Sequence, residues 1–309
     1  MALLSLSLAG CGEDPEPPGK VAVGVGEQDS VPFAEGAWKT AGLKKSRIVI
    51  PYDVALEPGP TRAKMDRFYL TSRQEGVELL VAFNPTEGAK CPQRPCPLPS
   101  IDRYTDAFRA FRKRYPALKV IAPVNEANHN SQPTYRNPRR AAEYYNVVRR
   151  LCRGCQVVAA DILDETNMRS WLEEFKRTAE RPRIWGLHNY KDTNPRPGQR
   201  LGGTREFLRL VPQGEVWLTE TGGIVKFQLA NGKTLFPMNE NRANRNTQRM
   251  FDLARRHRDR ITRLYIYHWR APLENNRFDA GLLTPDGIAR PAYHTVVDRL
   301  RRQSEYFAR

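Results

Sequence analysis

Histidine is scarce in this sequence, with five residues in a chain of 309. None of the five lies in the first strand-like run, "VAVGVG" (21–26), where metal-dependent barrel hydrolases usually carry paired imidazole ligands. The continuation "GVGEQ" also lacks the third glycine of a dinucleotide-binding turn. These absences argue against a catalytic metal and a bound dinucleotide, and we expect no cofactor.

Cysteine is also sparse, and four of its five residues form two close pairs. Cys91 and Cys96 bound "CPQRPC", and Cys152 and Cys155 bound "CRGC". In an oxidising compartment each pair predicts a short disulfide. Zinc binding by the four is the alternative, which the prolines of the first pair and the lack of a nearby histidine disfavour. A redox role for "CRGC" is also disfavoured, because the motif follows a helical segment and precedes a strand.

The apolar segment at the N-terminus is too short to span a bilayer as a helix. It closes on Leu-Ala-Gly-Cys, which resembles the bacterial lipoprotein cleavage box, with the lipid on Cys11. No positive charge precedes the run, so either the true start lies upstream or this is an ordinary leader in which Cys11 is incidental. We favour an extracytoplasmic, membrane-anchored lipoprotein, in which residues 1–19 are the signal and a proline-rich tether.

Acidic residues are outnumbered by basic ones, 34 to 50, which gives a net charge of +16. Such a balance is compatible with nucleic acid, a membrane surface or an acidic polymer. The basic stretches 109–115 and 254–260 lie inside helical patterns, and no nucleic-acid-binding motif is recognisable. We interpret the charge as solvated helix faces and expect no nucleic-acid partner, although an acidic polysaccharide substrate remains open.

Apolar runs alternate with amphipathic segments along the rest of the chain, and near-continuous Val/Ile/Leu runs are typical of parallel strands covered on both faces. Eight such units predict an α/β protein with a single (β/α)8 TIM barrel over residues 20–309. No second domain is visible. The expected strands are 21–26, 47–52, 77–83, 118–124, 155–161, 183–190, 215–220 and 263–269. The expected helices are 32–42, 59–75, 101–114, 138–151, 167–179, 203–210, 241–257 and 290–302.

Polar side chains follow the predicted strands at the end where the active site of such barrels lies. Buried carboxylates are costly unless they are paired or hydrogen-bonded. Glutamates at the ends of strands four and seven therefore indicate a functional site. Capping of the barrel rim is the alternative for each residue taken alone. The strand-end residues are Glu27, Asp53, Asn84, Asn125, Glu126, Asp161, His188, Tyr190, Glu220, His268 and Trp269.

Four of these strand ends together resemble the retaining glycoside hydrolases of clan A, the barrel superfamily with catalytic glutamates on strands four and seven. The matching motifs are "VNEANH" (124–129), "LHNY" (187–190), "LTETGG" (218–223) and "YHWRAP" (267–272). Arg47 and the stretch "GLLTPDGIARPAYHTV" (281–296) extend the resemblance, which runs from residue 21 to about 300. No single motif is specific, and no family within the clan is assigned.

The resemblance implies a role for each matching residue. Glu126 would be the acid/base, with a raised pKa, and Glu220 the nucleophile of a double displacement through a covalent glycosyl-enzyme. Asn125 would bind the sugar 2-hydroxyl. Arg47 and Tyr190 would donate to Glu220, with an ion pair to another strand-end carboxylate as the alternative for Arg47.

Further substrate contacts are expected from His188, which could also tune the acid/base, and from Trp269 as a platform under the sugar. A core position is the alternative for both. Asn84 is a further candidate for substrate binding, with Glu27, Asp53, His129 and His268 as weaker ones. The longest loops, 84–100 and 222–240, would form the cleft walls.

We therefore expect a monomeric retaining glycoside hydrolase that acts on a carbohydrate substrate, of unassigned sugar and linkage. A transglycosylase using the same site is one alternative. A lipid-anchored carbohydrate-binding barrel without turnover is the other, and the presence of both glutamates argues against it.

Overall fold

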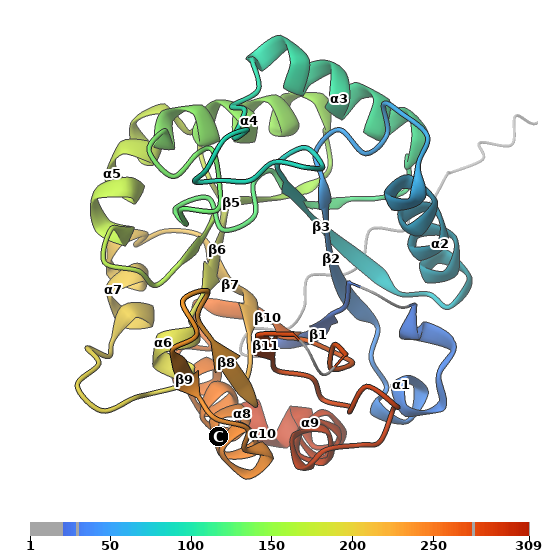
Figure 1. Ribbon diagram of the computed structural model, residues 1–309, viewed down its shortest axis with the longest axis vertical. Helices are drawn as coiled ribbons and strands as arrows, with labels where there is room; N and C mark the ends of the chain where they lie inside the picture. The colour runs from blue at the N-terminus through green and yellow to red at the C-terminus, as the bar shows by residue number, and fades with distance from the viewer. Residues whose placement is uncertain (1–20, 29–30, 274–275, 309) are drawn as a thin grey trace, which may run out of the picture.

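Eight parallel strands close on one another in the computed structural model, which describes residues 21–28, 31–273 and 276–308 (Figure 1). Their order around the barrel is β1-β10-β7-β6-β5-β4-β3-β2, so each strand lies beside its neighbours along the chain. The strands are β1 (Ala22–Gly26), β2 (Lys45–Pro51), β3 (Glu78–Asn84), β4 (Val120–Ala122), β5 (Gln156–Leu163), β6 (Ile184–His188), β7 (Glu215–Thr221) and β10 (Ile261–Tyr267). The predicted (β/α)8 barrel is confirmed.

Helices surround the barrel, as Figure 1 shows. They are η1 (Pro32–Ala34), α1 (Gly36–Ala41), α2 (Pro60–Gln74), α3 (Ile101–Arg114), α4 (Pro138–Leu151), α5 (Met168–Thr178), α6 (Tyr190–Thr193), α7 (Gly203–Leu210), α8 (Glu240–Arg256), α9 (Pro291–Arg301) and α10 (Gln303–Ala308). The bounds of α3, α4 and α7 are those predicted. Ser100 caps α3 by accepting from the backbone N–H of Arg103 at 3.2 Å, and Pro138 opens α4.

Two apolar cores hold these layers together. A small cluster fills the barrel interior, with the fully buried Trp217 and Tyr265 as its largest members. The larger cluster lies between the strands and the helices. In α3, Tyr104, Phe108 and Phe111 form one buried face, because their spacing repeats with the helical turn.

A three-stranded antiparallel sheet is the main departure from the predicted pattern. It consists of β8 (Lys226–Gln228), β9 (Thr234–Phe236) and β11 (Phe278–Asp279), in the order β11-β8-β9. Residues 222–240 were expected to be a loop. They contain a hairpin instead, because Asn231-Gly232 supplies a tight turn, with Gly232 at φ 85°.

Two further predictions concern segments outside the barrel strands. The sulfur atoms of Cys91 and Cys96, and those of Cys152 and Cys155, are bonded, so both predicted disulfides are confirmed. The lipid-bearing Cys11 and the boundary at residue 19 lie outside the described residues. Over the described ranges, no helix combines the length and the apolar character needed to cross a membrane.

Candidate active site

The carboxyl ends of the strands surround a cavity of about 610 Å³. Glu126, Glu220, Asn125, Asn84 and Tyr190 all line it. These side chains lie far apart in the sequence and meet because parallel strands of a barrel end at the same rim.

Arg47 connects three strand ends beneath the cavity. Its Nη1 donates to Oε2 of Glu220 at 2.6 Å, and its Nη2 donates to Oδ1 of Asn125 at 2.5 Å. The guanidinium is completely buried and also lies 3.4 Å from Asp161. A second donor, the hydroxyl of Tyr190, reaches the other oxygen of Glu220 at 3.0 Å. The Glu220 carboxylate is therefore fixed through both oxygens.

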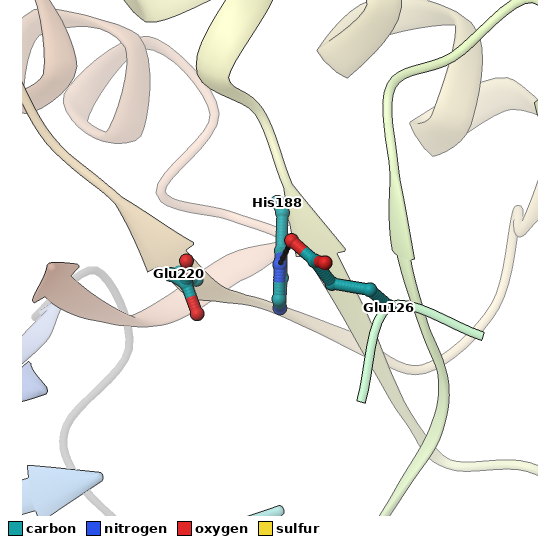
Figure 2. Close-up of side chains that lie close together, drawn as sticks. All are labelled: Glu126, His188 and Glu220. Carbon is teal, nitrogen blue, oxygen red and sulfur yellow. Dashed lines mark hydrogen bonds and ion pairs between the residues drawn. The ribbon is translucent and has the colours of Figure 1, made fainter. Parts of the chain in front are cut away.

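Glu126 approaches Glu220 from the turn that follows β4 (Figure 2). Its backbone has φ 46°, a left-handed conformation that non-glycine residues seldom adopt. One side-chain oxygen of each glutamate and one nitrogen of His188 all lie within 4.8 Å of one another. Carboxyl groups about 5–5.5 Å apart are typical of retaining glycosidases, and wider spacings are typical of inverting ones.

His188, the last residue of β6, bridges two carboxylates. Nδ1 lies 3.4 Å from Oε1 of Glu126, the contact drawn in Figure 2, and Nε2 lies 3.2 Å from Oδ1 of Asp161. Burial by itself would lower the pKa of this imidazole, but Asp161, Glu220 and Glu126 together raise it to about 9. At neutral pH His188 is therefore a cation that donates to both partners.

The charge on His188 reverses one prediction. Burial would raise the pKa of Glu126, but the hydrogen bond and charge of His188, with His129 and Arg47, lower it below the usual glutamate value. The expected raised pKa is therefore wrong for the unliganded site. The lowered pKa of Glu126 and the raised pKa of His188 both favour a proton on the imidazole, within hydrogen-bonding reach of the Glu126 carboxylate.

Asp161 enters the barrel through a bulge in β5. Ala160 and Asp161 both have positive φ, 69° and 51°, and the pairing of β5 with β6 shifts register between Ala159 and Ile162. Gly186 of β6 provides the space, since a Cβ there would lie 2.6 Å from Oδ1 of Asp161. Asp161 can therefore contact Arg47 and His188 from below, and Thr219 donates a hydrogen bond to it.

Within the described part of the chain, Glu126, His188 and Glu220 are the one trio of acidic, histidine or cysteine side chains close enough to share a metal ion. Their chemistry does not favour one. Each nitrogen of His188 already faces a carboxylate, so a metal would have to replace one of these contacts to reach an imidazole lone pair.

The predicted substrate-binding residues divide into two groups. Asn84, Asn125 and Tyr190 line the cavity as expected. Arg47 and His188 are fully buried beneath the cavity. The prediction that either of them contacts substrate directly is therefore wrong. Arg47 instead makes both the predicted contact with Glu220 and the alternative ion pair with Asp161.

Trp269 does not form the predicted platform. It is fully buried, packs edge-on against Trp38 at 5.1 Å between ring centres, and donates its indole N–H to Glu35 at 2.9 Å. The strand ends at Tyr267, so Trp269 turns outward into the layer between the barrel and α1. This is the core position left open by the sequence.

An aromatic wall takes the place of Trp269 at the cavity. Phe278 of β11 lies 5.3 Å from Phe227 of β8, 5.9 Å from Tyr190 and 6.0 Å from Tyr267. All four rings line the cavity and are partly exposed. Three of the four, Phe227, Phe278 and Tyr267, were missed. The alternation in "KFQLANGKTLF" around Asn-Gly is the signal that would have located β8 and β9.

Of the four weaker candidates for substrate contact, one lines the cavity and three do not. His129 lines the cavity, 3.9 Å from Glu126. Glu27 is buried and accepts from the backbone N–H groups of Gln28 and Arg270, so it caps a strand end. Asp53 accepts from Thr86 at the rim, and His268 is buried. None of these three lines the cavity.

The two long loops form walls of different hollows. Ile224, Phe227, Leu229, Leu235 and Phe236, in or beside the β8–β9 hairpin, line the main cavity. Residues of the segment 92–97 in loop 84–100 instead border a neighbouring hollow of about 1100 Å³.

No protein-family model matches the chain, and no curated protein sequence is detectably similar to it. Solved structures are similar in fold. A family 39 glycoside hydrolase from the gut symbiont Bacteroides cellulosilyticus WH2 matches 91% of this chain, with 15% identity and a TM-score of 0.62. The chain spans 63% of the length of that protein.

Two other matches have comparable scores. An endo-1,4-beta-xylanase from Caldicellulosiruptor owensensis has 13% identity and a TM-score of 0.60, over 91% of this chain and 97% of that one. A monomeric beta-xylosidase from Caulobacter crescentus CB15 has 13% identity and a TM-score of 0.63, over 91% of this chain and 68% of that one. The predicted resemblance to glycoside hydrolases is confirmed at the level of the fold.

Proposed function

We propose that this protein is a retaining glycoside hydrolase in which Glu220 is the nucleophile and Glu126 the acid/base. The observation that carries the proposal is the approach of these two carboxylates across one cavity, within 4.8 Å of each other. Such a spacing suits attack on an anomeric carbon held between them and leaves no room for the intervening water of an inverting mechanism.

In the first step, an oxygen of Glu220 attacks the anomeric carbon and the bond to the leaving oxygen breaks. Arg47 and Tyr190 hold the attacking carboxylate in place through 2.6 Å and 3.0 Å hydrogen bonds. Burial and the neighbouring Glu220 raise the pKa of Tyr190 well above that of a free tyrosine, so its hydroxyl stays protonated and can donate. Positioning of this kind replaces the reorganisation that a free carboxylate would need.

The leaving oxygen receives a proton through Glu126. In the resting site that proton is on Nδ1 of His188, 3.4 Å from the Glu126 carboxylate. Glu126 takes up this proton as it passes one to the leaving oxygen, and afterwards accepts a proton from the water that attacks the glycosyl-enzyme. Attack by a sugar hydroxyl in place of water would give transglycosylation at the same site.

Substrate contacts in this proposal come from the cavity walls. The amide of Asn125, oriented by Arg47 and by its own hydrogen bond to Asn84 at 3.2 Å, faces the position of a sugar hydroxyl. The aromatic wall around Phe278 offers a flat apolar surface to the C–H face of a sugar ring.

An extracytoplasmic location is part of the proposal. The two disulfides support an oxidising compartment. Anchoring through a lipid on Cys11 rests on the cleavage-box motif alone, and radiolabelled palmitate incorporation into wild type but not Cys11→Ser would test it.

The enzyme activity is tested by screening an oligosaccharide library for cleavage by mass spectrometry, with wild type, Glu220→Gln and Glu126→Gln. We expect wild type to cleave at least one glycan and Glu220→Gln to lose about 10⁴-fold or more in kcat. Proton NMR of the first product released should show the anomer of the substrate. Glu174→Gln, on the exposed surface of α5, is the matched control and should retain activity.

Binding distinguishes the remaining alternative. For a glycan that wild type cleaves, the affinity of Glu220→Gln is compared with that of wild type. If the two affinities are close, the Glu220 carboxylate acts in the chemical step and not in binding. If wild type binds glycans but cleaves none of them, the protein is a carbohydrate-binding barrel and the proposed hydrolase is wrong. An inverted anomer would contradict the assignment of Glu220 as a nucleophile.

A further inference from the structure

One corner of the cavity presents hydrogen-bond donors that have no acceptor among the described residues. Arg196 and Gln199 both line the cavity and lie in the connection between α6 and α7. Nε of Arg196 donates to Oε1 of Gln199 at 3.2 Å, which leaves Nε2 of Gln199 as a buried donor without a partner. Buried donors without partners are costly, so such a group in a binding cavity indicates a ligand acceptor.

The charge of Arg196 is also uncompensated. Among the side chains that the structure describes, no carboxylate lies within ion-pair distance of its guanidinium. The other full cation at the cavity, Lys191, is paired with Glu165 at 2.5 Å, and the adjacent Arg200 is paired with Glu206 at 3.6 Å. Arg196 is thus set apart from its neighbours in the same segment.

The position of Arg196 is fixed by its surroundings. The guanidinium carbon lies over the ring of Phe236, 5.6 Å from its centre, so β9 supports it from one side. Asn194 anchors one end of the connection through Gly222 and Ile224, with both hydrogen bonds at 2.8 Å. Asp192 anchors the other end by accepting the backbone N–H groups of Gly202 and Thr204.

The carboxylates of the cavity do not neutralise this corner. Glu126 faces His188, Glu220 faces Arg47, and Glu165 faces Lys191. The fourth carboxyl, Asp164, accepts backbone N–H groups of residues 191 and 192, and burial beside Asp192 raises its pKa to about 7. The field that an incoming anion meets here is therefore dominated by Arg196.

We propose that Arg196 and Gln199 form a subsite for a carboxylate on the saccharide, so that the substrate contains a uronic acid. This inference rests on the proposed glycosidase function and adds the chemical class of its substrate. The planar guanidinium and the neighbouring amide offer parallel donors to the two oxygens of a carboxylate. The opposite side of the barrel mouth, on the β1–β2 side, presents the amide of Gln28, so one end of the cavity binds the anion and the other binds hydroxyl groups.

The test compares acidic polysaccharides with their carboxyl-reduced counterparts, in which each uronic acid has become a neutral hexose. Glucuronoxylan, polygalacturonate and alginate are the probes. For the polysaccharide that wild type cleaves, we expect kcat/KM to be at least about tenfold higher on the acidic form, as for a hydrogen-bonded ion pair. In Arg196→Gln and in Gln199→Leu this ratio should fall towards one. Arg196→Lys should give an intermediate ratio, because it keeps the charge but loses the planar fork.

Arg200→Gln is the matched control, because it removes a neighbouring cation that does not line the cavity, and it should leave the ratio unchanged.

Equal cleavage of the acidic and the carboxyl-reduced forms by wild type would overturn the carboxylate subsite while leaving the hydrolase intact. A higher kcat/KM on the carboxyl-reduced form than on the acidic form would also overturn it. If wild type cleaves none of them, the oligosaccharide library still decides the proposed function, and affinity electrophoresis decides the inference. If the acidic polysaccharides retard the migration of wild type but not of Arg196→Gln, the carboxylate subsite is supported. If the acidic and the carboxyl-reduced forms retard wild type equally, the subsite is contradicted.

Discussion

Arg47 and Glu220 lie 173 residues apart in the sequence, and their side chains meet at 2.6 Å beneath the cavity. The arginine comes from β2 and the glutamate from β7, on different sides of the barrel. Because Arg47 also contacts Asn125 and Asp161, the same guanidinium aligns the proposed nucleophile Glu220 and the amide beside the proposed acid/base.

Replacing Arg47 by Met should destabilise the fold strongly. Glu220 and Asp161 would remain buried without their cation, a situation that costs about 3–5 kcal/mol in the free energy of unfolding. Urea titration followed by fluorescence measures this loss. As a control, Arg114→Met removes an arginine whose pair with Asp66 is partly exposed, and it should cost less than about 1 kcal/mol. Similar losses in the two variants would contradict the bridging role of Arg47.

The alkaline limb of the pH–rate profile should report His188. In wild type, the proton shared by His188 and Glu126 is lost as pH rises through about 9, so kcat/KM should fall above that pH. In His188→Gln, Glu126 holds the proton alone, so the limb should move to lower pH. His294→Gln, at an exposed histidine of α9, is the control and should keep the wild-type profile. An unmoved limb in His188→Gln would exclude the imidazole as the proton reservoir.

Stability should depend on the same imidazole. Its pKa is raised from 6.5 to about 9 on folding, so the stabilisation is complete below pH 6.5 and is lost as pH rises through 9. The urea midpoint of wild type should therefore decline between about pH 7 and 9. The decline should be weaker in His188→Gln, and a parallel decline in both proteins would assign it to other groups.

Gly186→Ala tests the bulge that admits Asp161. The new Cβ would lie 2.6 Å from Oδ1 of Asp161 and 2.7 Å from a methyl group of Val158, so one of them must move. We expect a loss of about 1–3 kcal/mol in stability, together with reduced kcat through displacement of His188. Gly36→Ala, where nothing lies within 4 Å of the added Cβ, should be neutral or stabilising by about 0.5–1 kcal/mol.

Trp269 and Phe278 should respond in opposite ways to truncation. Trp269→Ala removes a fully buried indole and should cost about 3–5 kcal/mol of folding free energy. Phe278→Ala alters the partly exposed cavity wall and should weaken substrate binding by up to about tenfold, with a much smaller effect on stability. Thermal unfolding and glycan binding, measured on both variants, separate the two roles.

The barrel could be predicted because its signal is periodic and local. Eight apolar runs separated by amphipathic segments determine the layers, and the cap Ser100 and the first-turn proline Pro138 indicate where two of the helices begin. The polar strand ends could be predicted as one cluster for the same reason, since closure of the barrel brings them to a common rim.

Side-chain direction at the strand ends could not be predicted in the same way. A bulge turns Asp161 inward, and the end of β10 at Tyr267 turns Trp269 outward, although both residues simply follow apolar runs. The pKa of Glu126 depends on the distance to His188, which no spacing in the sequence encodes. Arg196 looked like one more basic residue in a chain with 50 of them, because its lack of a partner is a property of three-dimensional packing.

The β8–β9 hairpin and β11 contribute Phe227, Phe236 and Phe278 to the cavity but belong to a sheet separate from the barrel strands. The two glutamates that we propose as catalytic, by contrast, lie in or directly after barrel strands β4 and β7, and Arg47, which contacts Glu220, lies in β2. Part of the cavity wall therefore belongs to a segment separate from the proposed catalytic residues. Exchanging this accessory sheet should alter which saccharides the cavity accepts while the proposed cleavage chemistry is kept.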